Sequence, residues 1–294
     1  MYVITGATGN IGKRISELLL SKGEKVRVIG RSQEKLKALV DKGAEAAAGK
    51  LEDLEFLTKA FRGAKAVFVM IPPKLDAEDE GKFQDQIGES LVKAIHKSGV
   101  KQVVNLSSVG ADRSEKTGPI LGLHYQENRL NDLNEVNVVH LRPAFFMENH
   151  LNSIPVIQGM GVYGSALRPD LVFPQIATRD IADAAAEELV SGVRGKSVRD
   201  LLGPEDLSMV QSAKILGKAI GKEDLPYVQF SYEDAAKGMM GAGLSRSVTE
   251  SVLEMEKGAN ENDLFKSIPR NAKNSTQTTL QEFSKVFAGA YSSQ

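Results

Sequence analysis

The sequence predicts an α/β fold, a doubly wound parallel sheet followed by a smaller, mainly helical C-terminal domain, and three observations support this prediction. Short apolar runs alternate with amphipathic stretches over the first half, as they do in strand-helix-strand units. A glycine-rich turn separates the first run from the first amphipathic stretch. After Pro143 the alternation stops. We therefore expect a first domain over residues 1–142 and a second over residues 143–294, which can return strands or helices to the first.

Six short apolar runs predict the strands of this sheet, and the stretches between them predict its helices. Most runs are rich in β-branched residues, which favour strands, whereas alanine marks the third run only weakly. Ile11, Ile15 and Leu18 recur at the spacing of one helical face. A helix after most strands is typical of a doubly wound, nucleotide-binding architecture. The predicted strands are residues 2–5, 26–29, 46–48, 67–70, 103–106 and 138–141, and the predicted helices are residues 11–19, 36–40, 54–61 and 87–95.

The second half is predicted to begin with a loop-rich segment and to continue with helices. Gly159, Gly161 and Gly164 match a common nucleotide-binding pattern, but no predicted strand precedes them and no helical period follows. We therefore interpret these glycines as a loop. A helix is expected over about residues 180–191, further helices are expected from residue 207 onward, and a short strand is expected over residues 227–230.

The composition excludes several classes of protein. The 294 residues include 37 Lys and Arg against 38 Asp and Glu, and a net charge of -1 provides no field to attract nucleic acid. The absence of cysteine excludes a disulfide scaffold and a thiolate nucleophile, and with only four histidines no metal site is expected. No apolar run reaches the roughly 18 residues of a membrane span, and no secretory signal is visible. We expect a soluble, cytoplasmic protein, and we leave its oligomeric state open.

The glycine-rich turn predicts a dinucleotide site. Its glycines allow a tight turn and a close approach of a pyrophosphate, which then lies at the free N–H groups of the following helix. A packing turn without a ligand is the alternative, but the strand and helix on either side favour nucleotide binding. The residues expected to contact the cofactor here are Gly6, Thr8, Gly9, Asn10, Ile11 and Gly12.

The end of the second predicted strand favours NADP over NAD. In NAD enzymes an acidic residue about 20 positions beyond the glycines accepts hydrogen bonds from the ribose. Arg31 stands there instead, nineteen residues after Gly12, with Ser32 beside it and Lys35 one turn into the next helix. A guanidinium fork suits a phosphate, so these three residues are expected to bind the 2′-phosphate. A solvated, functionless Arg31 is the alternative.

Polar residues after the fifth strand form a third candidate group. Ligands of doubly wound sheets lie outside the carboxyl ends of the strands, which places Ser107 and Ser108 in the cleft. Tyr125 and Arg129 are four residues apart and can share a helix face. A phenol near its reference pKa of about 10 needs a nearby cation to act as a general acid or base at neutral pH. Arginine can supply the charge but cannot relay a proton. Tyr125 as a surface or packing residue remains equally open.

Taken together, these segments resemble the short-chain dehydrogenase/reductase superfamily, whose cofactor domain is a Rossmann fold. Within it the similarity is strongest to the atypical NmrA-like branch, which includes NADPH-dependent quinone oxidoreductases, triphenylmethane dye reductases and non-catalytic redox-sensing regulators. Residues 141–149 look like the sixth strand and following loop of that branch, and residues 178–185 look like its helix start in the substrate domain. The resemblance extends over nearly the whole chain.

The resemblance implies roles for further residues. Ser108 and Tyr125 stand in the serine and tyrosine positions of the superfamily, Arg129 replaces its lysine, and His124 is a possible polar group of the cleft or a structural histidine. The branch often has an Asp after the third strand that contacts adenine, but Lys50 stands here. Residues implied to line the cofactor are Met70, Ile71, Pro72, Ser107, Ala144 and Phe145. An apolar substrate pocket, or alternatively ordinary core, is implied for Phe145, Phe146, Met160, Tyr163 and Phe173.

Three functions follow from these observations as hypotheses. The first is an NADPH-dependent reductase that transfers a hydride to a planar, electron-poor small molecule such as a quinone, with the protein mainly providing orientation. The second is a non-catalytic NADP-binding redox sensor, which would need only the glycine turn and Arg31. The third is an epimerase-like enzyme of the extended type, which the missing lysine disfavours.

Overall fold

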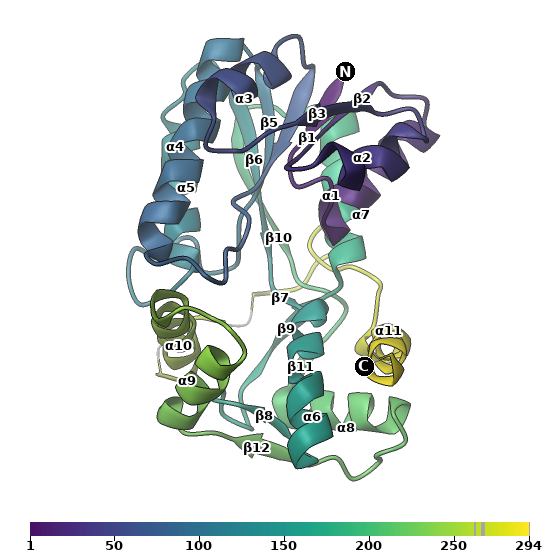
Figure 1. Ribbon diagram of the computed structural model, residues 1–294, viewed down its shortest axis with the longest axis vertical. Coiled ribbons are helices and arrows are strands. Elements are labelled where there is room, and N and C mark those ends of the chain that lie inside the picture. Colours follow the sequence, from purple (N-terminus) through teal and green to yellow (C-terminus); the bar gives the residue numbers. More distant parts are fainter. Residues whose placement is uncertain (262, 266–267, 294) are drawn as a thin grey trace.

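A seven-stranded parallel sheet forms the upper half of the molecule in Figure 1. This computed structural model describes residues 1–261, 263–265 and 268–293. All six predicted strands are confirmed, and a seventh, β10, which the sequence did not indicate, pairs with β6 at one edge. The sheet order is β10 (Lys196–Leu201), β6 (Asn137–Pro143), β5 (Gln102–Leu106), β4 (Ala66–Val69), β1 (Tyr2–Ile4), β2 (Val26–Gly30) and β3 (Glu45–Ala48).

Helices cover both faces of this sheet, as a doubly wound fold requires. One face is covered by α1 (Asn10–Ser21), α2 (Gln33–Val40) and α7 (Thr178–Ser191), and the other by α3 (Leu54–Phe61), α4 (Glu80–Ser98) and α5 (Ile120–Asn131). Helix α1 buries Ile15 and Leu19 against the strands, as its apolar spacing predicts. Helix α4 ends at Gly99, which adopts a left-handed φ of 77°.

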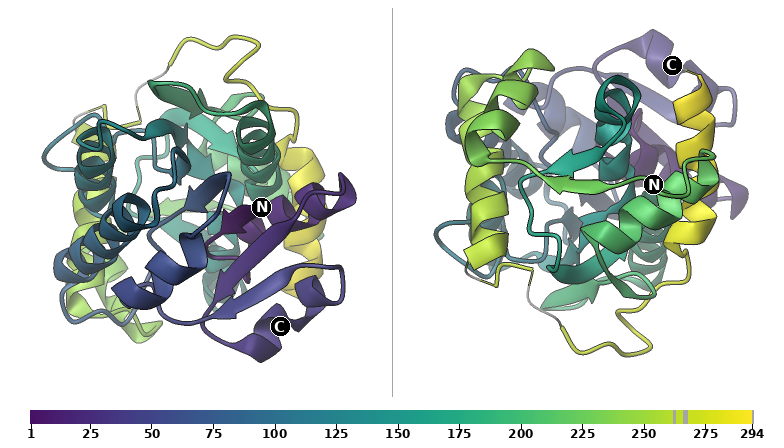
Figure 2. Two further views of the ribbon diagram at one scale, coloured as in Figure 1. Left: turned by 90° about the horizontal axis from the view of Figure 1, so that it is seen from above. Right: turned by 90° about the horizontal axis from the view of Figure 1, so that it is seen from below.

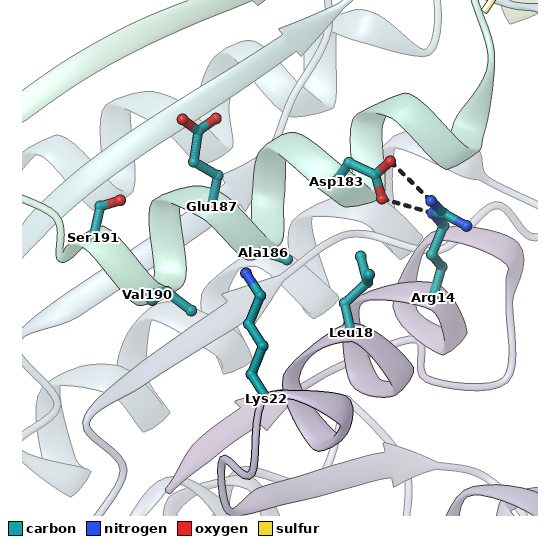
Figure 3. A pocket seen from close by; sticks show the side chains of 8 residues that line it. All are labelled: Arg14, Leu18, Lys22, Asp183, Ala186, Glu187, Val190 and Ser191. Atoms are coloured by element: carbon teal, nitrogen blue, oxygen red, sulfur yellow. Dashed lines mark hydrogen bonds and ion pairs between the residues drawn. The ribbon is translucent and has the colours of Figure 1, made fainter.

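Helix α7 comes from the second half of the chain but lies beside α1. The Arg14 guanidinium donates hydrogen bonds of 2.6 and 2.8 Å to the Asp183 carboxylate, which joins the two helices (Figure 3). A hollow of about 340 Å³ follows the outer surface of this helix pair from Arg14 to Lys22. The helical layer on this face of the sheet is therefore completed by a helix that lies about 170 residues after α1 in the sequence.

The lower half holds two small sheets, one 3-10 helix and five α-helices within the described residues. One small sheet has the order β11 (Asp206–Ser208), β9 (Val172–Ile176) and β7 (Phe145–Phe146), and the other pairs β12 (Tyr227–Gln229) with β8 (Tyr163–Ser165). A 3-10 helix, η1 (Met147–Ser153), follows β7. The α-helices here are α6 (Ile154–Met160), α8 (Met209–Ala219), α9 (Tyr232–Gly241), α10 (Arg246–Glu261) and α11 (Leu280–Ser292).

The segment expected to be a loop around Gly159 is more regular than predicted. Gly159 belongs to α6, Gly161 ends that helix with a left-handed φ of 71°, and Gly164 lies in β8. The order is helix, turn and strand, which is the reverse of a dinucleotide-binding turn. These glycines therefore lie in or end regular elements, and none of them belongs to a strand-turn-helix unit of the kind that binds a dinucleotide.

Helices α9 and α10 lie on one side of the lower half, and α11 lies on the opposite side (Figure 2, right). Helix α10 packs against the loop before α5, where Gly118 touches the carbonyl of Ser251 so closely that a Cβ would overlap it. Gly258 approaches the carbonyl of Lys116 in the same way. These two glycines let backbone meet backbone and fix α10 beneath α5. None of the helices in the described part of the chain is long and apolar enough to cross a membrane.

Candidate functional site

The glycine-rich turn lies between β1 and α1 and leaves the start of the helix open. Gly6 has a left-handed φ of 62°, and Gly12 lies so close to the Gly6 carbonyl that a Cβ there would overlap it. Gly9 precedes α1 without any side-chain cap, and no acidic residue occupies the first turn. By contrast, α3 and α4 begin with capping aspartates. Residues 8–10 are exposed, so the N–H groups of the first turn of α1 are available to an anion.

A second open helix start lies at the end of the neighbouring strand β2. Arg31 and Lys35 are exposed, and within the described residues neither forms a hydrogen bond or ion pair. Ser32 precedes α2 in an extended conformation, yet its side chain does not cap the helix. Two free cations, a free hydroxyl and uncapped N–H groups therefore gather at one point. This arrangement can bind a phosphate group.

The segment after β4 lies directly against the glycine turn. A Cβ on Gly6 would come within 2.6 Å of the Met70 sulfur, so Met70 covers the turn. Ile71 is buried and Pro72 is half-buried next to it. Across the sheet end, Ala144 is buried and donates its backbone N–H to the Leu201 carbonyl at 2.8 Å. These apolar residues border the carboxyl ends of the strands, where the sequence predicts that a dinucleotide binds.

Ser107 is turned away from the cleft and into a buried ionic network. Its hydroxyl donates to Glu127 Oε1 at 2.5 Å, and Arg142 donates to both oxygens of the same carboxylate at 2.9 and 2.6 Å. Glu127 is almost fully buried, with 4% of its side chain exposed. This carboxylate thus ties the ends of β5 and β6 to helix α5. The sequence reasoning missed Glu127 and Arg142, although an acid inside an amphipathic helix and an arginine at a strand end were visible signals.

The structure does not bring Tyr125 and Ser108 together. Residues two apart on a helix point about 200° away from each other, and Glu127 takes the direction toward the strand ends. Tyr125 instead borders a hollow of about 160 Å³ between α4, α5 and α10 and is 42% exposed. The Ser108 hydroxyl donates to the Val109 carbonyl at 2.9 Å. In the described part of the chain no hydrogen bond joins the Ser108 hydroxyl to the Tyr125 phenol, and a shared catalytic role for the two stays a prediction.

Arg129 shares a face with Tyr125, as the spacing predicts, but its charge is used elsewhere. Its guanidinium carbon lies 6.0 Å from the centre of the Tyr125 ring, and its Nη2 donates to Asp85 of α4 at 2.6 Å. The ion pair with Asp85 offsets the positive charge that would otherwise act on the phenol. Arg129 thus joins α5 to α4 and is turned away from the strand ends.

The histidines near the site are held by hydrogen bonds or burial. His124 Nδ1–H donates to the Ala111 carbonyl at 2.8 Å, and its Nε2 accepts from Asn128 at 3.0 Å, which fixes one neutral tautomer. His150 bridges Tyr163 at 2.6 Å and Gln175 at 2.9 Å. Burial lowers the pKa of His150 to about 4, so it stays uncharged at neutral pH. These contacts favour structural roles for both histidines.

The residues considered for an apolar substrate pocket separate into core and surface. Tyr163 and Phe173 are buried, at 3% and 0% exposure, and Phe173 packs on Phe145 with ring centres 5.3 Å apart. Met160 is 65% exposed at the end of α6. Phe145 and Phe146 are half-buried beside the strand ends. Of the five, only these two phenylalanines are placed to meet a ligand.

Comparisons with known proteins agree with this architecture. The chain matches the model of the NmrA-like family over residues 2–284. It is 27% identical to quinone oxidoreductase 2 of Escherichia coli over 98% of this chain and 99% of that protein. It is also 27% identical to a (4-alkanoyl-5-oxo-2,5-dihydrofuran-3-yl)methyl phosphate reductase of Streptomyces griseus, over 86% of this chain and 85% of that protein. An Escherichia coli NADPH-dependent quinone oxidoreductase solved with NADPH superimposes with a TM-score of 0.81 at 26% identity, covering 97% and 99% of the two chains.

Proposed function

The chain belongs to the NmrA-like family, and on that premise we propose that it is an NADPH-dependent reductase that transfers a hydride to a planar, electron-poor small molecule such as a quinone. The observation that supports this most is the pair of open helix starts, at Gly9 and at Ser32, beside two cations without partners. The first suits the pyrophosphate and the second suits the 2′-phosphate of NADP(H). Met70, Ile71, Ala144 and Phe145 would border the rest of the cofactor.

The residues of this chain orient the reactants and contribute little acid–base chemistry. When bound, NADPH supplies the hydride. Neither Tyr125, directed at α4 and α10, nor His124, fixed in one tautomer, is placed to deliver a proton at the strand ends. A quinone accepts hydride readily, and its reduced oxygen can take a proton from water. An acceptor of this kind suits a site whose main contribution is proximity and orientation.

The direct test follows the absorbance of NADPH with the purified protein and a panel of quinones and cationic dyes. We expect acceptor-dependent oxidation of NADPH, with much slower oxidation of NADH at equal concentration. A protein that binds NADPH tightly but consumes none of it with any acceptor in the panel would contradict the reductase proposal. The same result would favour a redox sensor, the second candidate, which is also favoured because the Ser108 hydroxyl and His124 Nδ1–H both donate to backbone carbonyls. An epimerase needs such a donor and is the least supported.

Tyr125→Phe should leave the turnover of an active enzyme unchanged within about twofold. The phenol lies at the α4 and α10 side of α5, so removal of its oxygen changes no group at the strand ends. Steady-state kinetics with a quinone acceptor would measure the effect. Gly12→Ala is the matched positive control, because its Cβ would overlap the Gly6 carbonyl and distort the dinucleotide turn. A large fall in kcat for Tyr125→Phe, with KM unchanged, would restore the phenol to the reaction.

A further inference from the structure

The ends of β2 and β3 bring a third cation to the open start of α2. The two strands run parallel with Gly30 opposite Ala48, and the Gly49 N–H donates to the Gly30 carbonyl at 3.0 Å. Arg31 is the first residue after β2, and Lys50 is the second residue after β3. Adjacent strands lie about 5 Å apart, so Arg31 and Lys50 both follow the carboxyl ends of neighbouring strands, with Lys50 one residue beyond the position level with Arg31.

The backbone of Lys50 is fixed while its side chain is free. The Lys50 carbonyl accepts from the Asp53 N–H at 3.2 Å, and the Phe56 ring packs directly over Gly49, where a Cβ would come within 2.6 Å of it. The Lys50 side chain is exposed and, within the described residues, forms no ion pair or hydrogen bond. Asp53 already caps α3 by accepting from the Phe56 N–H at 3.0 Å. The Asp53 carboxylate is therefore engaged by the helix start and forms no ion pair with Lys50.

The charge at this edge is incomplete for a phosphate monoester without Lys50. Such a group carries between one and a half and two negative charges at neutral pH. Arg31 and Lys35 bring two positive charges, but Glu34 lies between them in the first turn of α2 and offsets one. Lys50 adds a third positive charge from the neighbouring strand, and Glu34 and Glu52 are both exposed, so solvent screens the two acids alike.

We propose that Lys50 contacts the 2′-phosphate of NADP(H) and, together with Arg31, determines the preference for NADP(H) over NAD(H). This inference rests on the proposed function, because it concerns the same cofactor site. An ammonium group offers only donors and a positive charge, so it binds the charged oxygens of a phosphate more strongly than the neutral oxygen of a ribose hydroxyl, and it finds no acceptor on an adenine amine. Lysine at this position thus acts on the phosphate end of the cofactor, where the family pattern has an aspartate that contacts adenine.

The test is the dissociation constant of NADPH and of NADH, measured by titration calorimetry on the full chain. Lys50→Ala should weaken NADPH binding about tenfold, as expected for loss of one charge-assisted hydrogen bond, and should leave NADH within twofold. Lys50→Arg should stay within about threefold of the wild type for NADPH. Arg31→Ala is the comparator at the same phosphate and should weaken NADPH at least as strongly.

Lys25→Ala is the matched control, because the Lys25 side chain is exposed, has no partner among the described residues and precedes β2, at the opposite end of the strands from the proposed phosphate site. It removes the same charge from the protein and should change NADPH affinity less than twofold. Tight NADPH binding that is equally insensitive to Lys50→Ala and Lys25→Ala would overturn the role of Lys50 alone. A wild-type chain that binds neither dinucleotide would overturn the proposed function, and this inference with it.

Discussion

Replacing Glu127 with alanine should lower the free energy of unfolding by about 3 kcal/mol, because it leaves a largely buried arginine without its main partner. Arg142 donates two hydrogen bonds to the Glu127 carboxylate and has 17% of its side chain exposed. Its other acid, Asp112, is 3.8 Å away and largely exposed. The Ser107 hydroxyl would also lose its acceptor. Both losses fall on buried groups, where water compensates poorly.

Urea denaturation of the purified variants would measure this effect. Glu250→Ala is the matched control, because Glu250 also pairs with an arginine, Arg246, but both side chains are largely exposed. The control should lower the free energy of unfolding far less, because solvent screens an exposed pair. Glu127→Gln keeps the shape and should cost less than Glu127→Ala. A Glu127→Leu, Arg142→Met double variant should recover much of the loss, because it removes both charges together. Equal midpoints for Glu127→Ala and Glu250→Ala would contradict this account of the network.

Replacing Glu256 with glutamine should stabilise the protein at pH 8 by about 2 kcal/mol and should have little effect near pH 4.5. Glu256 of α10 is 8% exposed, and its Oε2 has no hydrogen-bond partner in the described part of the chain. Burial raises the pKa of this carboxyl to about 7. The hydrogen bond from the backbone N–H of Ala166 favours the ionised form but offsets only part of this increase. The folded protein therefore pays a desolvation cost when this group ionises.

The sign of the pH dependence follows from linkage. The pKa is about 4.5 in the unfolded chain and about 7 in the folded one, so the folded state binds more protons between these values. The contribution of Glu256 to the free energy of unfolding is fully present below pH 4.5. It is lost as the pH rises through 7, and the loss is at most about 3 kcal/mol. The difference between wild type and Glu256→Gln isolates this contribution from that of other groups. Glu254→Gln, at an exposed position of the same helix, is the matched control. A pH-independent difference for Glu256→Gln would refute the assignment.

Apolar periodicity predicted the sheet well and failed where a strand or a helix face carries polar residues. Strands β1, β4, β5 and β6 are largely buried inside the sheet, so their apolar residues, mostly valine, marked them clearly, whereas the edge strand β3 was marked only weakly by its alanines. β10 has the sequence Lys-Ser-Val-Arg-Asp-Leu and lies at the sheet edge with its first three residues exposed, so no apolar run marked it. Edge strands commonly carry charges of this kind.

The candidate site shows the same limit for helix α5. Spacing placed Tyr125 and Arg129 on one face, which is correct, but spacing alone does not say what that face meets. The face toward the sheet is marked by Glu127 and Gln126, both buried, and a pattern based on apolar residues does not find it. The ion pairs of Glu127 with Arg142 and of Arg129 with Asp85, together with the buried Leu130, show how the helix is turned. The glycine turn was easier to predict from the sequence, because Gly6 and Gly12 set its conformation locally.

The late position of β10 has a consequence for synthesis on the ribosome. Strand β6 ends at Pro143, but its outer neighbour ends at Leu201. At about 5–20 residues per second, several seconds pass during which the nascent chain presents the unpaired edge of β6 and the apolar face that α7 later covers. Such an edge can pair with another chain. We expect this interval to be the aggregation-prone stage of production, and a fragment that ends at residue 142 to remain in it permanently.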